Sequence, residues 1–265
     1  MVLESIISVK KAERKPADML LLGFVYSSIA ILLALWLFPG QASATAVLFT
    51  TIAMLPLMLN VILFEEKKEE RAEKISFRTH RQAIPFFIFL FLGLLLSFTL
   101  WYVILPDSTA GKLFSAQINT ISLVNSGASI GTWELTQAIL LNNLKVLAVA
   151  ILLSILYGAG AAFIFAWNAS IVAVAIGTVV KHASAASLPI YIQAFARYLA
   201  HGIPEITAYF IGGLAGGIIS YAIVRHKHKT KGFRKIMLDS LDLIIAAVIL
   251  LVLAAVIEVF VSANI

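Results

Sequence analysis

Long runs of apolar residues, separated by short polar segments, dominate this chain. A helix that crosses the hydrocarbon core of a bilayer needs about 20 mostly apolar residues. Seven runs are candidates, and the fifth of them is short for a span. They cover residues 17–38, 45–64, 84–105, 144–167, 170–180, 203–224 and 241–261. The pattern therefore predicts an all-α, polytopic bundle of about seven transmembrane helices.

The longest stretch without a clear span is 106–143. Its first half carries a rough helical stripe of apolar residues: Leu113, Phe114, Ile118, Ile121 and Val124. Residues 125–127 interrupt this stripe, and Trp133 begins a second segment. Loops of this length in compact proteins are usually functional or carry structure of their own. We expect one or two amphipathic helices here, lying at the outer membrane interface.

Composition supports a membrane location. Apolar residues make up 61% of the chain and charged residues 13%, whereas soluble domains carry roughly 25% charged residues. A soluble chain of this length could not bury so much apolar surface in one core. The absence of cysteine excludes a disulfide framework and any thiolate nucleophile or metal ligand. The N-terminus shows no cleavable signal, so we expect Met1 to be retained.

The basic residues are grouped. Of the 20 Lys and Arg residues, 16 lie in three segments, 10–15, 67–81 and 225–235. Seven spans place all three segments on one side of the membrane. Because Lys and Arg are held on the cytoplasmic side, we expect a multi-pass protein of the cell membrane with a cytoplasmic N-terminus and an external C-terminus. The net charge of +6 is thereby explained without nucleic acid as a partner.

The second span continues into a run of mixed charge, 65–74, in which Glu residues recur at helical spacing. This indicates a helical extension into the cytoplasm, stabilised partly by i,i+4 pairs. A docking surface for a cytoplasmic partner is the alternative. We therefore divide the chain into an N-terminal two-span hairpin with this extension, 1–82, and a membrane core with a C-terminal span, 83–265.

Polar residues at membrane depth are costly and therefore informative. Asn142 and Asn143 stand at the start of the fourth predicted span, where they could cap the helix or hydrogen-bond a neighbouring one. Gly158 and Gly160 lie in a run of small residues that permits close helix packing. Asn168 falls where the fourth and fifth spans would meet, which predicts a tightly packed hairpin with a polar turn.

The most specific feature is the segment 201–205. His201 and Glu205 stand four residues apart and could pair on one helical face. Pro204 is tolerated in the first turn of a helix, so we expect the helix to begin near Gly202. Glu205 would then lie near a positive helix end, and Arg197 could complete the cluster. The pair could be a structural staple, an ion or proton site, or part of a catalytic site.

Four glycines follow in the sixth span and are expected to form a helix-packing face: Gly212, Gly213, Gly216 and Gly217. These pieces together, from Asn142 to Val224, resemble the stage II sporulation protein M family in its archaeal form. The best matching element is the 201–205 segment before the glycine-rich span. The family often has Asn-Gly where this chain has Asn168-Ala169. In spore-forming bacteria the family scaffolds peptidoglycan hydrolases, and it supplies no established catalytic residues.

Three functional hypotheses follow. The resemblance favours a non-enzymatic membrane scaffold or assembly factor, with protein partners at 106–143 or at the cytoplasmic loops. The intramembrane His201, Glu205 and Asn168, with the short fifth span, would suit a channel or transporter. An intramembrane hydrolase would need converging ligands, and His201 and Glu205 alone clearly converge. We expect neither a cofactor nor a metal site, and the glycine-rich faces permit a homo-oligomer.

Overall fold

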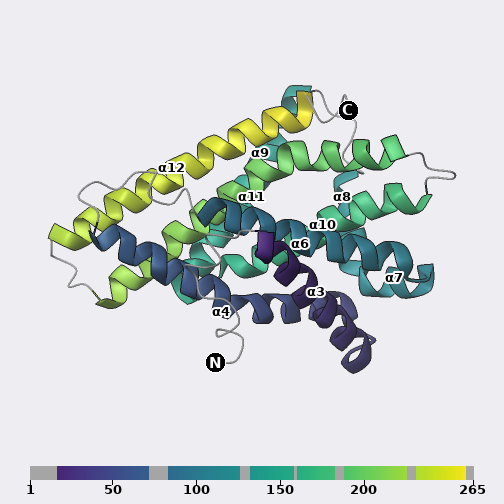
Figure 1. The fold of residues 1–265 in the computed structure, drawn as a ribbon. Helices are drawn as coiled ribbons and strands as arrows, with labels where there is room; N and C mark the ends of the chain where they lie inside the picture. Colours follow the sequence, from purple (N-terminus) through teal and green to yellow (C-terminus); the bar gives the residue numbers. More distant parts are fainter. Residues whose placement is uncertain are drawn as a thin grey trace.

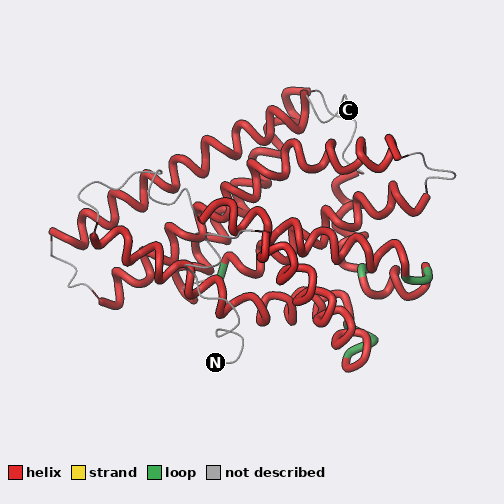
Figure 2. The backbone as a smooth tube through the Cα atoms, viewed as in Figure 1, coloured by secondary structure: helices red, strands yellow, loops and turns green. Residues whose placement is uncertain are grey.

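The computed structural model describes residues 17–71, 83–125, 132–157, 160–182, 188–225 and 231–260. These ranges contain nine α-helices and no strand (Figures 1 and 2). The helices are α3 (Ala17–Leu37), α4 (Ala42–Arg71), α6 (Ala83–Ile104), α7 (Asp107–Leu113), α8 (Ser115–Asn125), α9 (Thr132–Tyr157), α10 (Ala161–His182), α11 (Leu188–Arg225) and α12 (Lys231–Phe260).

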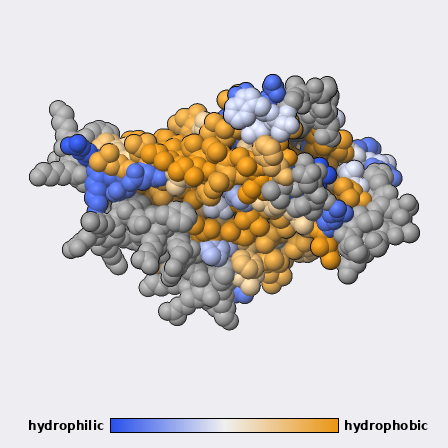
Figure 3. Space-filling view, turned by 90° about the horizontal axis from the view of Figure 1, so that it is seen from above, coloured by the Kyte–Doolittle hydropathy of each residue, from blue (hydrophilic) through white to orange (hydrophobic). Residues whose placement is uncertain are grey.

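Seven of the described helices are long and apolar enough to cross a membrane, namely all except the short helices α7 and α8. They run broadly along one direction of the molecule (Figure 1). A continuous apolar band covers the middle of the surface seen in Figure 3, and polar patches gather toward its two ends. The predicted all-α bundle of seven membrane-length helices is confirmed.

The described helices form two groups. In the first group, α3 packs against α4 and α6, and α10 packs against α6 and α4. In the second group, α11 packs against both α9 and α12. Contacts between α10 and α11 join the groups (Figure 1). We call the end of the bundle that carries Arg71, Arg225 and Lys231 the basic end, and the end that carries α7 and α8 the cap end.

Backbones approach closely between α3 and α6. A Cβ atom on Gly93 would overlap the backbone of Leu20, and one on Gly23 would overlap the carbonyl of Leu90. Small residues allow this approach, which increases van der Waals contact where lipid removes the hydrophobic drive between helices. The same interface carries a hydrogen bond of 2.9 Å between the hydroxyl groups of Ser28 and Ser97.

Aromatic side chains connect the two groups of helices. The ring of Phe87 on α6 stacks on Phe210 of α11, with centroids 3.6 Å apart, and meets the edge of Phe165 on α10 at 5.9 Å. All three side chains are less than 2% exposed or at that limit. Offset-stacked and edge-to-face arrangements are favourable ring geometries. The core therefore runs through the junction of α6, α10 and α11.

The boundary between the fourth and fifth spans differs from the prediction. Helix α9 ends at Tyr157 and α10 begins at Ala161, so the turn lies at the small residues and not near Asn168. The α10 span covers Ala161–Lys181 and is not short. The prediction was wrong because Asn168 looked like a turn residue. Its amide instead donates a hydrogen bond of 2.8 Å to the Ile164 carbonyl, so it is tolerated inside the helix.

Helix starts also differ from the prediction. Helix α9 begins at Thr132, so residues 132–143 belong to a spanning helix. The cap outside the spanning helices therefore consists of α7 and α8 alone among the described elements. Asn142 and Asn143 therefore lie well inside α9 and do not cap it. Helix α11 begins at Leu188, with Pro204 in its interior. The expected helix start at Gly202 is wrong, and Glu205 does not lie near a helix N-terminus.

Candidate functional site

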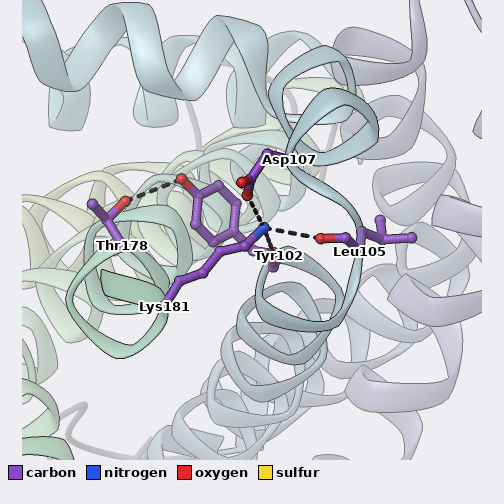
Figure 4. A network of polar contacts seen from close by, with 5 residues as sticks. All are labelled: Tyr102, Leu105, Asp107, Thr178 and Lys181. Carbon is purple, nitrogen blue, oxygen red and sulfur yellow. Dashed lines mark hydrogen bonds and ion pairs between the residues drawn. The ribbon is translucent and has the colours of Figure 1, made fainter. Parts of the chain in front are cut away.

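A polar clamp fastens the cap to the bundle (Figure 4). Lys181, in the last turn of α10, forms an ion pair of 2.6 Å with Asp107 at the start of α7. Its ammonium group also donates hydrogen bonds to the carbonyls of Leu105 at 2.9 Å and Tyr102 at 3.4 Å. Asp107 is 86% exposed and Lys181 18% exposed. Because carbonyls at a helix end lack intrahelical partners, Lys181 caps α6 as well as holding α7.

The aromatic ring of Tyr102 fills the space beside this clamp. Its hydroxyl lies 3.2 Å from the hydroxyl of Thr178 on α10, and the Lys181 ammonium lies 5.5 Å from the ring centroid. A Cβ atom on Gly177 would overlap the same ring. Phe114, at the α7–α8 junction, meets the Tyr102 ring edge-on at 5.4 Å. The packing joins the ends of α6 and α10 to the cap.

The side chain of Gln117 anchors α8 to the bundle. This side chain is 1% exposed. Its carbonyl accepts a 2.8 Å hydrogen bond from Ser43 on α4, and its amide donates one of 3.0 Å to Ser170 on α10. The Ser43 hydroxyl also accepts a hydrogen bond from the backbone N–H of Ala116. Buried polar groups satisfied in this way specify a single arrangement, so α8 has a fixed position between α4 and α10.

In the second group, α9 and α11 pack through glycines. A Cβ atom on Gly212 would overlap the side chain of Leu147, and one on Gly216 would overlap the carbonyl of Ile151. Both helices run from the cap end to the basic end. A step of four residues along α9 therefore matches a step of four residues along α11. The difference in residue number between facing positions on α9 and α11 is therefore the same for both contacts. The same difference also locates Asn143 relative to α11.

Two further glycines of the predicted packing face, with Gly160, lie near the turn between α9 and α10. A Cβ on Gly213 would overlap Ala161, and one on Gly160 would overlap Leu153. The hydroxyl of Ser154 accepts a 3.0 Å hydrogen bond from the Ala161 N–H and so caps α10. Gly217 is buried. Gly158 lies outside the described residues.

The polar site of this group lies toward the cap end. The hydroxyl of Tyr209 donates a hydrogen bond of 2.8 Å to the carboxylate of Glu205, one turn earlier on α11. Glu258 lies in the last turn of α12, the helix that packs against α11. Tyr209 is fully buried, and the two carboxyl side chains are partly buried. Buried charged groups of this kind are costly in a membrane and mark functional sites.

Asn143 is a buried polar residue of α9. Buried residues on α9 follow one stripe of helical spacing: Asn143, Leu147, Ala150 and Ser154. Leu147 packs against Gly212. The same register one turn earlier puts Asn143 level with Ala208, which stands between Glu205 and Tyr209 in the sequence. Asn143 is 5% exposed, and its amide nitrogen has no hydrogen-bond partner within the described part of the chain.

The other predicted site residues lie at the margins. The ring of His201 hydrogen-bonds to the backbone of Arg197 and meets the Tyr198 ring edge-on at 6.3 Å. The side chain of Arg197 is exposed. Asn142 is exposed as well, and its amide lies 3.5 Å from the Asn143 carbonyl oxygen. Asn168 lies on α10 and hydrogen-bonds within its own helix. Within the predicted set, Asn142 and Asn143 are neighbours on α9, and Glu205 accepts a hydrogen bond from Tyr209 on its own helix.

Sequence reasoning did not include Tyr209, Gln117 or Lys181 in the site. The Tyr209 spacing of four residues from Glu205 was a signal, because i,i+4 side chains are neighbours on a helix. Gln117 and Lys181 depend on contacts between helices far apart in sequence. Among the described residues, no group of three or more His, Cys, Asp or Glu side chains could hold a metal ion.

The comparisons with known proteins agree with this architecture at the level of family. Neither the curated proteins nor the solved structures give a match. The family model described as stage II sporulation protein M matches residues 84–263, which is more than half of the chain. The match begins at α6 and includes the cap, the α9–α11 interface and the Glu205 site. The chain is therefore a multi-pass membrane protein that belongs to the stage II sporulation protein M family.

Proposed function

We propose that this protein is a non-enzymatic membrane scaffold whose binding platform is the α7–α8 cap. The observation that carries the proposal is the attachment of the cap by buried and half-buried polar contacts. Gln117 bridges α4 and α10, and Lys181 joins α10 to Asp107 and to the end of α6. A surface held in one conformation loses little entropy when a partner binds.

The free surface of the cap suits a protein partner. Its exposed side chains are mainly polar and small: Asp107, Ser108, Lys112, Ser115, Asn119 and Ser122. The buried side of the same two helices holds Leu113 and Phe114, each 1% exposed. The cap therefore has a polar face and an apolar face and is seated on the bundle by the latter. Membership of a family with a scaffolding role in spore-forming bacteria supports the same function.

The distribution of basic residues supports an orientation. The basic end carries Arg71, Arg225 and Lys231 at helix ends, and the positive-inside rule places such residues in the cytoplasm. We infer that the cap faces the outside and that the N-terminus is cytoplasmic. Partners of the platform would then be external proteins or external parts of membrane proteins.

Affinity capture in mild detergent tests the scaffold. The full chain is compared with the double variant Asn119→Arg, Ser122→Arg, which adds bulk and charge on the exposed face of α8. Arg234→Glu, an exposed change at the basic end, is the control, with a change in net charge of the same size and opposite sign. We expect wild type and control to retain the same partners and the α8 variant to lose them. A chain that is recovered alone, or partners that all three retain, would contradict the proposal.

Transport is the second candidate, because Glu205 and Tyr209 on α11 and Glu258 on α12 put two carboxyl groups and a phenol on two helices that pack together. Carboxyl groups on facing helices occur along ion and proton pathways. Flux of common ions into liposomes that contain the protein, compared with Glu205→Gln, tests this candidate. An absence of flux in wild type, or equal flux in both proteins, would contradict it.

A further inference from the structure

Lys145 places a positive charge on the outward side of α9. The buried stripe of this helix includes Asn143 and Leu147, and Leu147 packs against α11. Lys145 stands two residues from each of them, and two residues turn an α-helix by about 200°. Its side chain is accordingly exposed. Within the described part of the chain, its ammonium group has neither an ion pair nor a hydrogen bond.

This charge lies near the middle of the membrane. Two exposed aromatic residues mark the ends of the α9 span: Trp133, 69% exposed, at the cap end and Tyr157, 71% exposed, at the basic end. Trp and Tyr favour the two membrane–water interfaces. Each stands about 18 Å from Lys145 along the helix axis. Leu147 packs against Gly212, which also lies near the middle of its own span.

Lipid headgroups are out of reach of the Lys145 ammonium group. The hydrocarbon core of a bilayer is about 30 Å thick, so a residue at its middle is about 15 Å from either headgroup region. The five bonds from Cα to Nζ span about 6 Å when extended. Lysines near helix ends extend their side chains to the interface, but this distance is too long. Because charged side chains in hydrocarbon are costly, Lys145 needs an acceptor at its own depth.

Neither α9 nor a symmetric dimer supplies this acceptor. Glu134 is exposed on the same face of α9, but it lies about 16 Å from Lys145 along the axis, at the level of Trp133. A two-fold interface pairs the same patch on both subunits, so a dimer through this face would bring Lys145 close to its own copy. Like charges repel strongly at low dielectric. The acceptor is therefore expected on a different protein.

The surface around Lys145 allows a second helix to pack closely. Ala138 and Ala148 are exposed on the same face, and small residues let helix backbones approach each other. Leu152 is 55% exposed and provides apolar contact area. Asn142, one turn before Lys145, is also exposed and adds a second polar side chain. Polar side chains at membrane depth hydrogen-bond between helices.

We propose that the exposed face of α9 binds a membrane-spanning helix of a partner protein, and that Lys145 pairs there with a Glu or Asp side chain near the middle of that helix. The ammonium group donates hydrogen bonds to the carboxylate, and neither charge is then left in hydrocarbon. The contact rests on the proposed scaffold function and deepens it, because it gives a membrane-anchored partner an attachment besides the cap. It involves neither α7 nor α8, so the two surfaces can be tested separately.

Association with a synthetic spanning helix tests the proposal. The full chain has no cysteine, so Gly111→Cys, at an exposed position of α7, carries a single acceptor dye. The probe is a donor-labelled peptide of about 20 leucine and alanine residues with one central Glu, mixed with the chain in phosphatidylcholine vesicles at neutral pH. We expect saturable energy transfer with this peptide. Association should be about tenfold weaker when leucine replaces the central Glu.

Variants of Lys145 assign the contact to this residue. Lys145→Met is compatible with the fold because lipid favours an apolar side chain at this depth, and it should bind the Glu peptide only as weakly as the leucine peptide. Lys145→Glu should lose the Glu peptide and bind a peptide with a central Lys. Arg234→Glu, the same charge change at an exposed position of α12, should bind as wild type does. Equal binding of the Glu and leucine peptides by wild type, or full binding of the Glu peptide by Lys145→Met, would overturn the proposal.

Other occupants of this face give different results. Energy transfer between two labelled chains that is lost in Lys145→Met would assign the face to a second copy. Binding that requires phosphatidylglycerol and is equal for both peptides would assign it to lipid headgroups. Either result overturns the proposal. The peptide presents nothing for the cap to bind, so the variant Asn119→Arg, Ser122→Arg should bind it normally, and a failure of the cap platform is distinguishable from a failure of the α9 contact.

Discussion

The two helix groups treat their polar side chains differently. In the group of α3, α4, α6 and α10, the buried hydroxyl groups of Ser43 and Ser170 are bridged across helices by Gln117 of α8. Four buried polar atoms lack a partner in the described part of the chain, and three of them lie on α9 and α12: Asn143, Asp239 and Ser240. The fourth is the Thr99 hydroxyl on α6.

This difference distinguishes a first group that is built for stability from a second group that is the candidate for function. Polar groups in a membrane are costly unless they are paired, and the first group pairs them and adds close backbone contact. The second group leaves the Asn143 amide nitrogen, one Asp239 oxygen and the Ser240 hydroxyl without a partner within the described residues. Substitutions in the first group should therefore reduce stability, whereas removal of the unpaired donor in the second should raise it.

Gly93→Ala should have the largest effect. The new methyl group would overlap the backbone of Leu20, which cannot move without separating α3 from α6. We expect a loss of about 3 kcal/mol, at the upper end for overpacked interiors, measured as a large decrease in Tm in mild detergent. Gly111→Ala on α7 is the control, since its Cβ would meet nothing within 4 Å. An equal Tm for both variants would contradict the close α3–α6 contact.

Gln117→Leu should follow in size. The change leaves Ser43 without its acceptor and Ser170 without its donor, in a position that is 1% exposed. Broken buried networks cost more than single exposed hydrogen bonds, and we expect a loss of about 2 kcal/mol. Thermal unfolding against Gln137→Leu, an exposed position on α9, measures this effect. If both variants unfolded at the same temperature, Gln117 would not anchor α8.

The sequence predicted the general architecture because membrane-length apolar runs need no tertiary information. It did not predict the cap contacts, since Lys181 and Asp107 are separated by 74 residues and meet through the docking of α10 against α6. It misplaced Asn168 and Pro204 because both residues were read from turn and helix-start preferences. Tertiary packing overrides such local preferences when a helix is long and apolar.

The part of the Glu205 site that lies on a single helix was predictable from the sequence. Residues on one helix, such as Glu205, have neighbours at fixed spacing, and Tyr209 follows this rule. The positions of Glu258 and Asn143 relative to Glu205 depend on how α12 and α9 pack against α11. The parallel α9–α11 register is set by side chains of Leu147 and Ile151 against glycines, and no single segment of the chain encodes that offset.

Two variants at the Lys181 clamp separate the contribution of the ion pair to stability from that of the hydrogen bonds. Lys181→Met removes the ion pair and the hydrogen bonds to the Leu105 and Tyr102 carbonyls, so we expect a loss of about 1.5 kcal/mol. Asp107→Asn removes the charge of a side chain that is 86% exposed, and it should cost about 0.5 kcal/mol or less. Unfolding in low and high salt compares them, and equal losses would show that the ion pair dominates.

Asn143→Leu should change stability in the opposite direction. Leucine has the same branched arrangement of side-chain heavy atoms as asparagine, extends the apolar stripe of α9, and removes an amide nitrogen that has no acceptor within the described residues. Replacing an unpaired buried polar group by an apolar one of similar shape is neutral or stabilising, and we expect a gain of about 1 kcal/mol. Thermal unfolding at neutral pH measures it, with Asn142→Leu at the adjacent exposed position as control. A clear loss of stability in Asn143→Leu alone would mean that the amide is paired in the folded protein, and the distinction between the two helix groups would then disappear.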